Sequence, residues 1–305
     1  MLNNSNPYFR QVELLLAVMP LVGPETCFAL KGGSAINLFL RDLPRISVDL
    51  DLTFLPVKDR AQSLVEMDAA LGRIGTTITR KMPGAVVQKS GGAPGERTKL
   101  LVTRDGVGVK VEVSPVLRGA VGQPEVHGVC PAVENQFGYV EMPLLHHHDL
   151  YAGKLCAALD RQHPRDLFDV KLLLENESIG DELLQVFIVY LISGNRPLVE
   201  MIAPQFQPLE AVFDAQFKGM TSQPTSVAEL EETRRTLVDM VQDRLTDAQR
   251  KFLFSFKQGE PEWPLLSVPI AEHLPAVQWK LINIRRMTKT KHAAAAEKLK
   301  KILFG

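Results

Sequence analysis

Two aspartates, Asp49 and Asp51, stand two positions apart in Ser47–Phe54, where apolar and polar residues alternate. Side chains two apart on a β-strand project from the same face of a sheet, about 7 Å apart along the strand. Two like charges at this distance repel each other, and a divalent cation bound between them relieves the repulsion. Magnesium takes carboxylate and phosphate oxygens, and a pair of ions clamps the attacking and leaving oxygens of a displacement. The spacing therefore fits metal-assisted phosphoryl chemistry, although many such pairs are only the solvated face of a strand.

A Gly32-Gly33-Ser34 sequence lies upstream, between a short apolar segment and a helical pattern. Glycines let the backbone come close to a phosphate, and the amides at a helix start favour an anion. The same tripeptide is also a common turn. Its combination with the aspartates inside residues 28–52 predicts a phosphate cradle and a metal-binding edge in one small unit. Lys31, beside the cradle, either steers a phosphate or is simply exposed.

A third acid, Glu112, belongs to a predicted hairpin. Two apolar runs, Leu100–Thr103 and Val107–Val113, flank Arg104-Asp105-Gly106, and an Asp-Gly turn is a strong hairpin signal. On the second strand Glu112 shares one face with Lys110, and the valines share the other. We expect Glu112 to join the two aspartates if this hairpin lies beside their strand.

Four charged residues fall on two consecutive predicted helices. Lys154 and Arg161 are seven apart on the first, so they lie on nearly the same face and both could reach a triphosphate; the alternative is a pair of exposed helix charges. Asp166 and Asp169 are three apart on the second, so they are neighbours. Asp166 is either a base or a group that orients Lys154 or Arg161. Asp169 is equally well a helix-surface acid or a buried structural one.

The elements that carry these residues change in character along the chain. The N-terminal part alternates helices, predicted at 8–22 and 61–73, with strands, and contains a turn-rich segment at 83–97 that we expect to be a mobile loop. From about residue 143 the pattern is helical, with capping-box starts at Ser226 and Thr246. Residues 215–226 are predicted to be a surface linker.

Two runs of the N-terminal part, Leu30–Leu38 and Arg45–Leu52, resemble motif I of the AbiEii/MenT-type nucleotidyltransferases. These belong to the DNA polymerase β-like superfamily and are the toxins of type IV toxin–antitoxin systems. The family's other three motifs are matched in order by Val109–Val113, Asp149–Ala158 and Arg161–Val170. The resemblance covers about residues 28–175. It implies an α+β fold, with a polymerase β-like core (1–142, a mixed sheet with helices) and a helical C-terminal domain (143–305) that completes the active-site cleft.

The resemblance also implies roles for individual residues. Asp49, Asp51, Lys154 and Asp166 are the expected catalytic residues; Asp49, Asp51 and Glu112 the expected Mg²⁺ ligands; and Gly33, Ser34, Lys154 and Arg161 the expected nucleotide-binding residues. Aspartate is frequent in the family where this chain has Glu112. An acceptor hydroxyl would attack the α-phosphorus of a nucleoside triphosphate and release pyrophosphate. Several family members add nucleotides to the 3′ end of tRNA and so block translation, and a cognate antitoxin is expected.

Two other functions use the same core. A nucleotidyltransferase that modifies a small molecule or a protein would keep the same acids. A non-catalytic nucleotide-binding interaction module would keep the fold, but it would have no need of paired carboxylates.

Composition narrows the class of protein. The 305 residues correspond to about two domains. The 35 Lys and Arg balance the 35 Asp and Glu, which excludes a globally basic nucleic-acid coat protein. Three scattered cysteines, Cys27, Cys130 and Cys156, argue against a disulfide scaffold and fit a reducing cytosol. Apolar runs are shorter than the roughly 20 residues that span a bilayer, and no signal-peptide pattern opens the chain. We expect a cytoplasmic protein.

One region departs from this balance. Residues 280–301 hold eight Lys or Arg and one acid, Glu297, for a net charge of 8 − 1 = +7. A solvated helix face is the ordinary interpretation of such a run, and a contact surface for an RNA phosphate backbone, such as that of tRNA, is the alternative. His146-His147-His148 is predicted to be polar surface, because consecutive side chains of a helix point in different directions.

Overall fold

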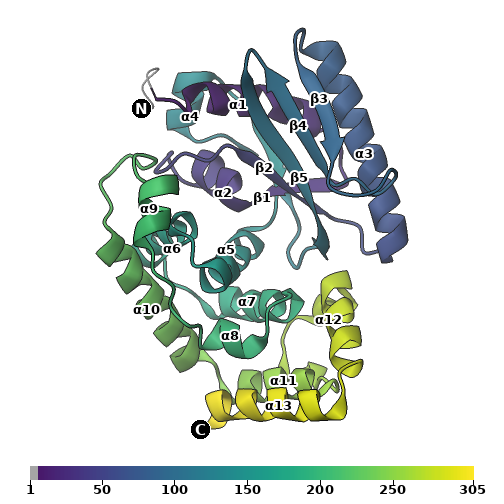
Figure 1. Ribbon diagram of the computed structural model, residues 1–305, viewed down its shortest axis with the longest axis vertical. Helices are drawn as coiled ribbons and strands as arrows, with labels where there is room; N and C mark the ends of the chain where they lie inside the picture. Colours follow the sequence, from purple (N-terminus) through teal and green to yellow (C-terminus); the bar gives the residue numbers. More distant parts are fainter. Residues whose placement is uncertain (1–5) are drawn as a thin grey trace. The chain divides into compact units, whose positions relative to one another are not determined.

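The computed structural model of the chain describes residues 6–305 (Figure 1). The chain divides into two compact units. The first comprises residues up to His146 together with Gly219–Gln223, and the second comprises His147–Lys218 and Pro224–Gly305. The first unit is built on a mixed seven-stranded sheet, and every element of the second is a helix, so the predicted α+β class is confirmed. The boundary expected at 142/143 falls inside a strand of the first unit's sheet.

The strands of the first unit follow the order β3-β4-β5-β2-β1-β7-β6. Their bounds are β1 Phe28–Lys31, β2 Asp49–Phe54, β3 Val86–Ser90, β4 Lys99–Arg104, β5 Val107–Arg118, β6 Glu125–Gly128 and β7 Glu141–Leu144. The aspartate-bearing strand β2 lies at the centre, antiparallel to β1 and parallel to β5. The predicted hairpin is confirmed as β4–β5, turning at Asp105 (φ 50°) and Gly106 (φ 77°). This pairing brings the hairpin beside the two aspartates.

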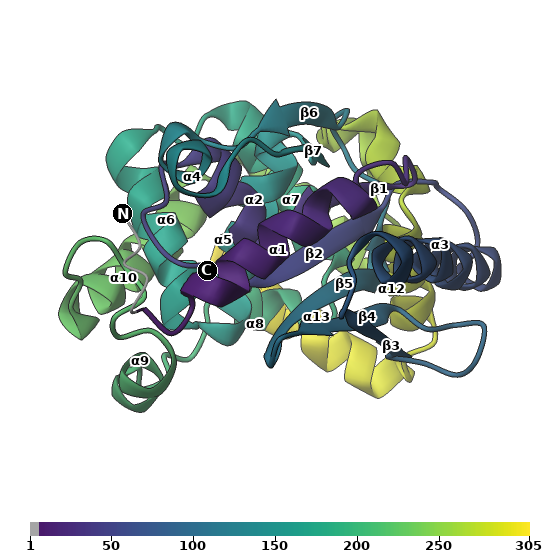
Figure 2. The same cartoon turned by 90° about the horizontal axis from the view of Figure 1, so that it is seen from above.

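Two long helices cover one face of this sheet. Helix α1 (Phe9–Val22) contacts β2, β5 and β7, α3 (Arg60–Lys81) contacts β3, β4 and β5, and the two helices contact each other (Figure 2). Leu50 and Leu52 are fully buried on β2, whereas the alternating Asp49 and Asp51 are partly exposed. The acids therefore lie on the face opposite α1 and α3. The unit is completed by α2 (Gly32–Ala35), the π-helix η1 (Ile36–Leu40) and α4 (Pro131–Phe137).

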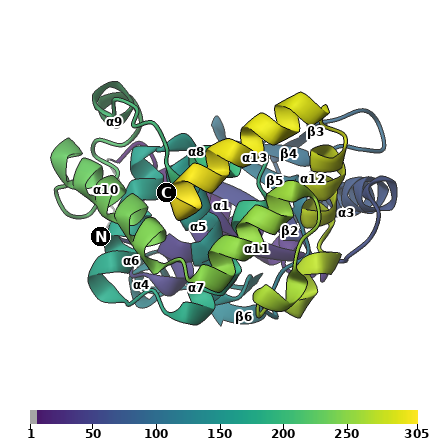
Figure 3. The ribbon, with the colours of Figure 1, turned by 90° about the horizontal axis from the view of Figure 1, so that it is seen from below.

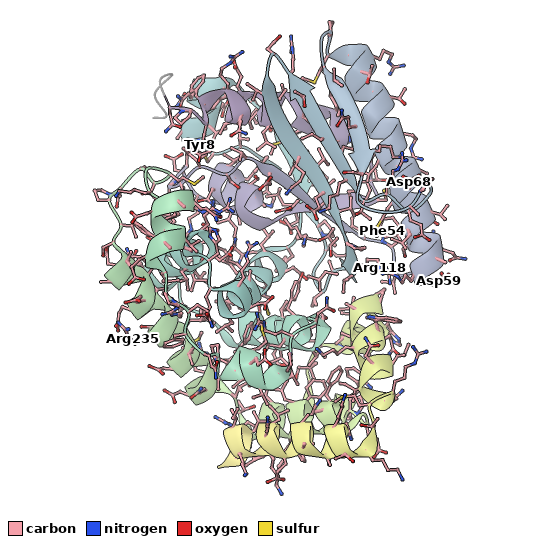
Figure 4. All side chains as sticks on the ribbon, viewed as in Figure 1. Tyr8, Phe54, Asp59, Asp68, Arg118 and Arg235 are labelled. Carbon is pink, nitrogen blue, oxygen red and sulfur yellow. The ribbon has the colours of Figure 1, made fainter. Side chains whose placement is uncertain are left out.

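A buried arginine joins the end of β5 to the start of α3. Arg118 pairs in register with Phe54, and its Nη1 donates to the carbonyl oxygens of Lys58 (3.3 Å) and Asp59 (3.1 Å) (Figure 4). Asp59 in turn caps α3, since its side chain accepts from the backbone N–H of Gln62 at 3.0 Å. The bend between β2 and α3 is thus fixed from two sides.

Two predictions about loops are wrong. Residues 86–90, inside the segment expected to be a loop, form the edge strand β3, which pairs antiparallel with β4. The segment predicted to be a surface linker contains the buried Phe217 and Met220. Its residues 219–223 belong to the first unit: Ile46 donates its N–H to the carbonyl of Met220 at 2.8 Å, and Thr221 forms a bridge with Arg45. This contact fixes the chain that leads into β2.

The second unit is a set of packed helices. Their bounds are α5 His147–Arg161, α6 Pro164–Asn176, α7 Asp181–Ser193, α8 Leu198–Ile202, α9 Glu210–Gln216, α10 Val227–Arg244, α11 Asp247–Gln258, α12 Pro275–Arg285 and α13 Lys289–Phe304, with 3₁₀ turns at Trp263–Leu265 and Pro269–His273. Both predicted capping boxes, at Ser226 and Thr246, are confirmed. Helix α5 packs against α6, α7 and α10, and α11 lies beside α13 (Figure 3). Within residues 6–305, no helix is long and apolar enough to cross a membrane.

Candidate active site

The turn between β1 and α2 brings the backbone against the acid-bearing strand. Gly32 has φ 76°, a conformation that L side chains rarely adopt, and a Cβ added there would lie 2.8 Å from Oδ2 of Asp51. A Cβ at Gly33 would lie 2.6 Å from Nη2 of Arg45 and 2.8 Å from Oγ of Ser47. Gly32 therefore excludes a side chain, and a side chain at Gly33 would require the ends of Arg45 and Ser47 to shift. Gly32 is needed because the turn touches the strand that carries the acids.

Ser34 fixes that turn to β2. Its buried hydroxyl donates to the backbone carbonyl of Asp49 at 2.5 Å and lies 3.1 Å from the hydroxyl of Ser47. These contacts hold the start of α2 beside the first aspartate. A role of Ser34 as a direct phosphate ligand stays a prediction.

The three predicted acids meet on one face of the sheet. The parallel register of β2 and β5 pairs Asp51 with Glu112, and Asp49 with Lys110. On the other side of β2, Lys31 of β1 pairs with Asp51. The side chains of Asp49 and Glu112 are 38% and 29% exposed, so both are open to solvent and to a ligand. The structure therefore brings together the acids that the motifs singled out.

Two lysines join these acids. Nζ of Lys110 lies 3.7 Å from Oδ1 of Asp49 and 3.5 Å from Oε2 of Glu112, and Nζ of Lys99 lies 2.8 Å from Oε1 of Glu112. We call Asp49, Asp51, Glu112, Lys99 and Lys110 the carboxylate–lysine cluster. The sequence assigned no role to either lysine, although the alternation in β5 already placed Lys110 on the face of Glu112.

The charges of this cluster shift two pKa values. Partial burial opposes the charged form of Lys110, but Asp49, Glu112 and Asp51 outweigh it and raise the lysine pKa. Partial burial likewise opposes the charged form of Glu112, but Lys99 and Lys110 lower the pKa of that carboxyl below its usual value. Lys110 and Glu112 are therefore charged at neutral pH, as their ion pairing requires.

The donor chemistry of the cluster suits magnesium. Within residues 6–305, no three His, Cys, Asp or Glu side chains are already gathered around one metal position. Instead, the positively charged ammonium of Lys110 faces Asp49 and Glu112, where it takes the place of a metal cation. Magnesium is commonly held by one or two carboxylates, with substrate phosphates and water completing its shell. Asp49 and Asp51 fit that kind of site.

The second unit holds the other predicted residues in a buried group. Nζ of Lys154, on α5, lies 2.8 Å from Oδ1 of Asp166 and 2.9 Å from Oδ2 of Asp169, both on α6. The three side chains are 6%, 1% and 0% exposed, respectively. Of the two alternatives for Asp169, the structure therefore shows the buried one. We call Lys154, Asp166, Asp169 and Arg161 the Lys154 cluster.

Arg161 extends this cluster to the surface. Its Nε lies 2.5 Å from Oδ2 of Asp166 and its Nη2 lies 3.0 Å from Oδ1, while the arginine side chain is 60% exposed. Burial opposes ionisation of Asp166, but Lys154 and Arg161 outweigh it and hold the pKa of that carboxyl well below its usual value. A carboxylate so stabilised is a weak base. The geometry supports Asp166 as a positioning residue for the two cations.

Two other groups singled out in the sequence, the histidines at 146–148 and Lys280 of the basic run, have different surroundings. His147 and His148 contact separate acids, Glu177 at 2.9 Å and Glu182 at 4.0 Å, while their own rings meet edge-on with centroids 5.7 Å apart. Lys280 was counted in the basic run of residues 280–301, but its ammonium group is not part of a surface that could contact an RNA backbone. Its Nζ donates to the carbonyl oxygens that follow α7, those of Gly194 (2.6 Å), Asn195 (3.1 Å) and Arg196 (2.8 Å). Burial, reinforced by Lys257, lowers the pKa of Lys280 to about 8.

The other cations of that run are exposed. They are Arg285, Arg286, Lys289, Lys291, Lys298, Lys300 and Lys301. Most of them lie on α13 together with the exposed Glu297, so the C-terminal end of the second unit is rich in exposed positive charge.

Comparison with known proteins gives a family match and a match among solved structures. The model of a family described as "Nucleotidyl transferase AbiEii toxin, Type IV TA system" matches residues 13–283. Among solved structures, the chain is similar to MenT4, a nucleotidyltransferase toxin from Mycobacterium tuberculosis H37Rv, with a TM-score of 0.60 over 92% of this chain and 95% of that one. The two are 16% identical in sequence, so this likeness concerns the fold. No curated protein sequence matches the chain.

Proposed function

The chain belongs to the AbiEii nucleotidyltransferase toxin family of type IV toxin–antitoxin systems, and we propose that it transfers a nucleoside monophosphate to the 3′ end of tRNA. Membership confirms the resemblance seen in the four motifs and makes the chain a nucleotidyltransferase. It implies a nucleoside triphosphate as substrate and a cognate antitoxin as partner. The observation that supports the reaction centre is the turn at Gly32, which meets Asp51 on the strand of the two aspartates without room for a side chain.

The first unit supplies the reacting centre in this proposal. Nucleotidyltransferases generally use a divalent metal ion, and Asp49 and Asp51 are the residues that would hold magnesium, with Glu112 as the neighbouring third acid. When bound, the ion neutralises phosphate charge and acidifies the attacking hydroxyl. The backbone amides of Gly33 and Ser34 would approach the triphosphate oxygens, which the small residues of this turn favour.

The predicted phosphate-binding cations belong to the second unit. We expect Arg161, whose side chain is 60% exposed, to neutralise the triphosphate and the departing pyrophosphate, while Asp166 holds Arg161 and the buried Lys154 in place. The acceptor hydroxyl oxygen forms a bond to the α-phosphorus and gives up its proton to solvent water, and the bond from that phosphorus to the pyrophosphate oxygen breaks. Positioning and preorganised charge account for most of the rate enhancement in such a reaction.

The basic surface supports RNA as the acceptor. Seven exposed cations near the C-terminus are complementary to the negative charge of a phosphate backbone. Binding through phosphate contacts releases counterions and weakens steeply as salt rises. A small-molecule acceptor would not show this dependence to the same degree.

The test is transfer of label from each α-labelled nucleoside triphosphate to total tRNA, with magnesium present and products separated on a denaturing gel. We expect label on tRNA with a preferred nucleotide, and tRNA affinity that falls as salt rises. Triphosphate binding without labelled tRNA would contradict the tRNA assignment and direct the search to small-molecule or protein acceptors. Triphosphate binding without turnover on any acceptor would support a non-catalytic module.

A further inference from the structure

Lys110 has no role in the proposed reaction, yet its ammonium group lies between two of the predicted acids, Asp49 and Glu112. It lies on β5 directly beside Asp49 in the parallel register, and two positions before Glu112 on its own strand. Its ammonium is within 3.7 Å of Asp49 and within 3.5 Å of Glu112. A cation therefore already occupies part of the space in which the acids would bind a metal ion.

Lys99 holds Glu112 from the opposite side. It is the cross-strand partner of Glu112 on β4, and its Nζ lies 2.8 Å from Oε1, whereas Lys110 contacts Oε2. Each oxygen of the Glu112 carboxylate thus faces one ammonium group. Glu112 is more firmly paired than Asp49, which has only the longer contact to Lys110 in this cluster.

The charges on this face of the sheet balance without a metal ion. The three acids contribute −3, and the lysines of neighbouring strands, Lys31, Lys99 and Lys110, contribute +3, for a sum of 0. A divalent cation that binds to a neutral group of side chains gains little electrostatic attraction. A metal ion that arrives with a triphosphate brings its own negative charge, and the triphosphate offers a displaced ammonium a new partner.

We propose that Lys110 is an exchangeable cation of the active site: it neutralises Asp49 and Glu112 in the free enzyme and yields Asp49 to the metal ion when the metal–triphosphate complex binds. This inference rests on the proposed metal-binding role of Asp49 and Asp51. Lys110 is a positioning residue in this scheme, because it sets when the acids are available to the metal. Its side chain is 43% exposed, so it has room to move.

The consequence is measurable without nucleotide and without activity. In the full-length protein, Lys110→Met removes the competing charge, so Mn²⁺ alone binds more tightly. Two unit charges 4 Å apart in water interact strongly enough that we expect roughly a five-fold lower Kd. The probe is Mn²⁺, followed by the electron paramagnetic resonance signal of the unbound ion. Lys110→Arg keeps the charge and is expected to bind Mn²⁺ like the wild type.

Lys58→Met is a matched control. Lys58 is also in the first unit, its side chain is 42% exposed, and it pairs with an acid, Glu66, at 2.7 Å, away from the carboxylate–lysine cluster. Its removal is expected to leave Mn²⁺ binding unchanged. Equal Kd values for the wild type and Lys110→Met, or tighter binding in Lys110→Arg as well, would overturn the proposal.

Asp49→Asn separates this inference from the proposed function. Loss of Mn²⁺ binding in Asp49→Asn, with an unchanged Kd in Lys110→Met, would reject only the role of Lys110. Mn²⁺ binding that survives in Asp49→Asn would reject the metal site itself. Should Lys110→Met not fold, Lys110→Gln retains a polar side chain without the charge and serves the same comparison.

Discussion

The two charged clusters of this chain are built in opposite ways. In the carboxylate–lysine cluster, Lys110 is 43% exposed and its contacts to the acids are 3.5 and 3.7 Å long. In the Lys154 cluster, Lys154 is 6% exposed and its contacts are 2.8 and 2.9 Å long. Exposed, long ion pairs contribute little stability and exchange partners readily, whereas buried ones are costly to break. The first arrangement suits a site that takes up a metal ion, and the second suits a fixed charge.

The largest expected effect comes from breaking the buried cluster. Asp166→Asn leaves Lys154 with one buried carboxylate of the cluster instead of two and removes the carboxylate that Arg161 contacts. Removal of one partner from a buried ion pair lowers the free energy of unfolding by about 3 kcal/mol. Urea unfolding of the wild type and the variant measures the loss. A variant as stable as the wild type would show that the Lys154 cluster is not the fixed element described above.

The pH dependence of stability sharpens the same contrast. The folded-state pKa of Asp166 is lowered, so its contribution to stability is present above its unfolded-state pKa and is lost as the pH falls. We therefore expect the stability difference between the wild type and Asp166→Asn to shrink below about pH 4. Urea unfolding of both proteins from about pH 7 to about pH 3 tests this. A difference that stays constant over this range would mean that Asp166 is not held as a charged carboxylate.

The smallest effect is expected in the exposed cluster. Glu112→Gln removes the partner of Lys99 and Lys110, but these pairs are partly exposed and screened by solvent. The free energy of unfolding is expected to change by at most about 1 kcal/mol. The measurement is again urea unfolding, at low and high salt. A loss as large as that of Asp166→Asn would erase the distinction between the clusters.

Sequence reasoning succeeded where one short stretch determines the geometry. The alternation around Asp49 and Asp51 places both on one face of β2, and Asp105-Gly106 specifies the turn of the β4–β5 hairpin, because both features depend on local backbone geometry. Glu112 joined the aspartates because that hairpin pairs with β2.

Predictions from the sequence were wrong where contacts between distant parts of the chain determine the local structure. Met220 is buried because its segment returns to the residues before β2, more than 170 positions earlier in the sequence. Strand β3 forms in a turn-rich segment because β4 offers it a partner. Lys280 appeared to be one of a run of surface charges, but it is held by carbonyl groups of the α7–α8 connection. The position of Lys110 between two acids follows from the register of β5 against β2, which composition does not reveal.

The acids beside the glycine turn perform the transfer in the proposed reaction. The most direct measurement is the rate of labelled-nucleotide transfer to tRNA by Asp49→Asn, compared with Asp105→Asn. Asp105 is an exposed aspartate in the β4–β5 turn, where asparagine fits the backbone equally well. We predict that Asp49→Asn folds but transfers no label, while Asp105→Asn matches the wild type. Normal transfer by a folded Asp49→Asn protein would contradict the account.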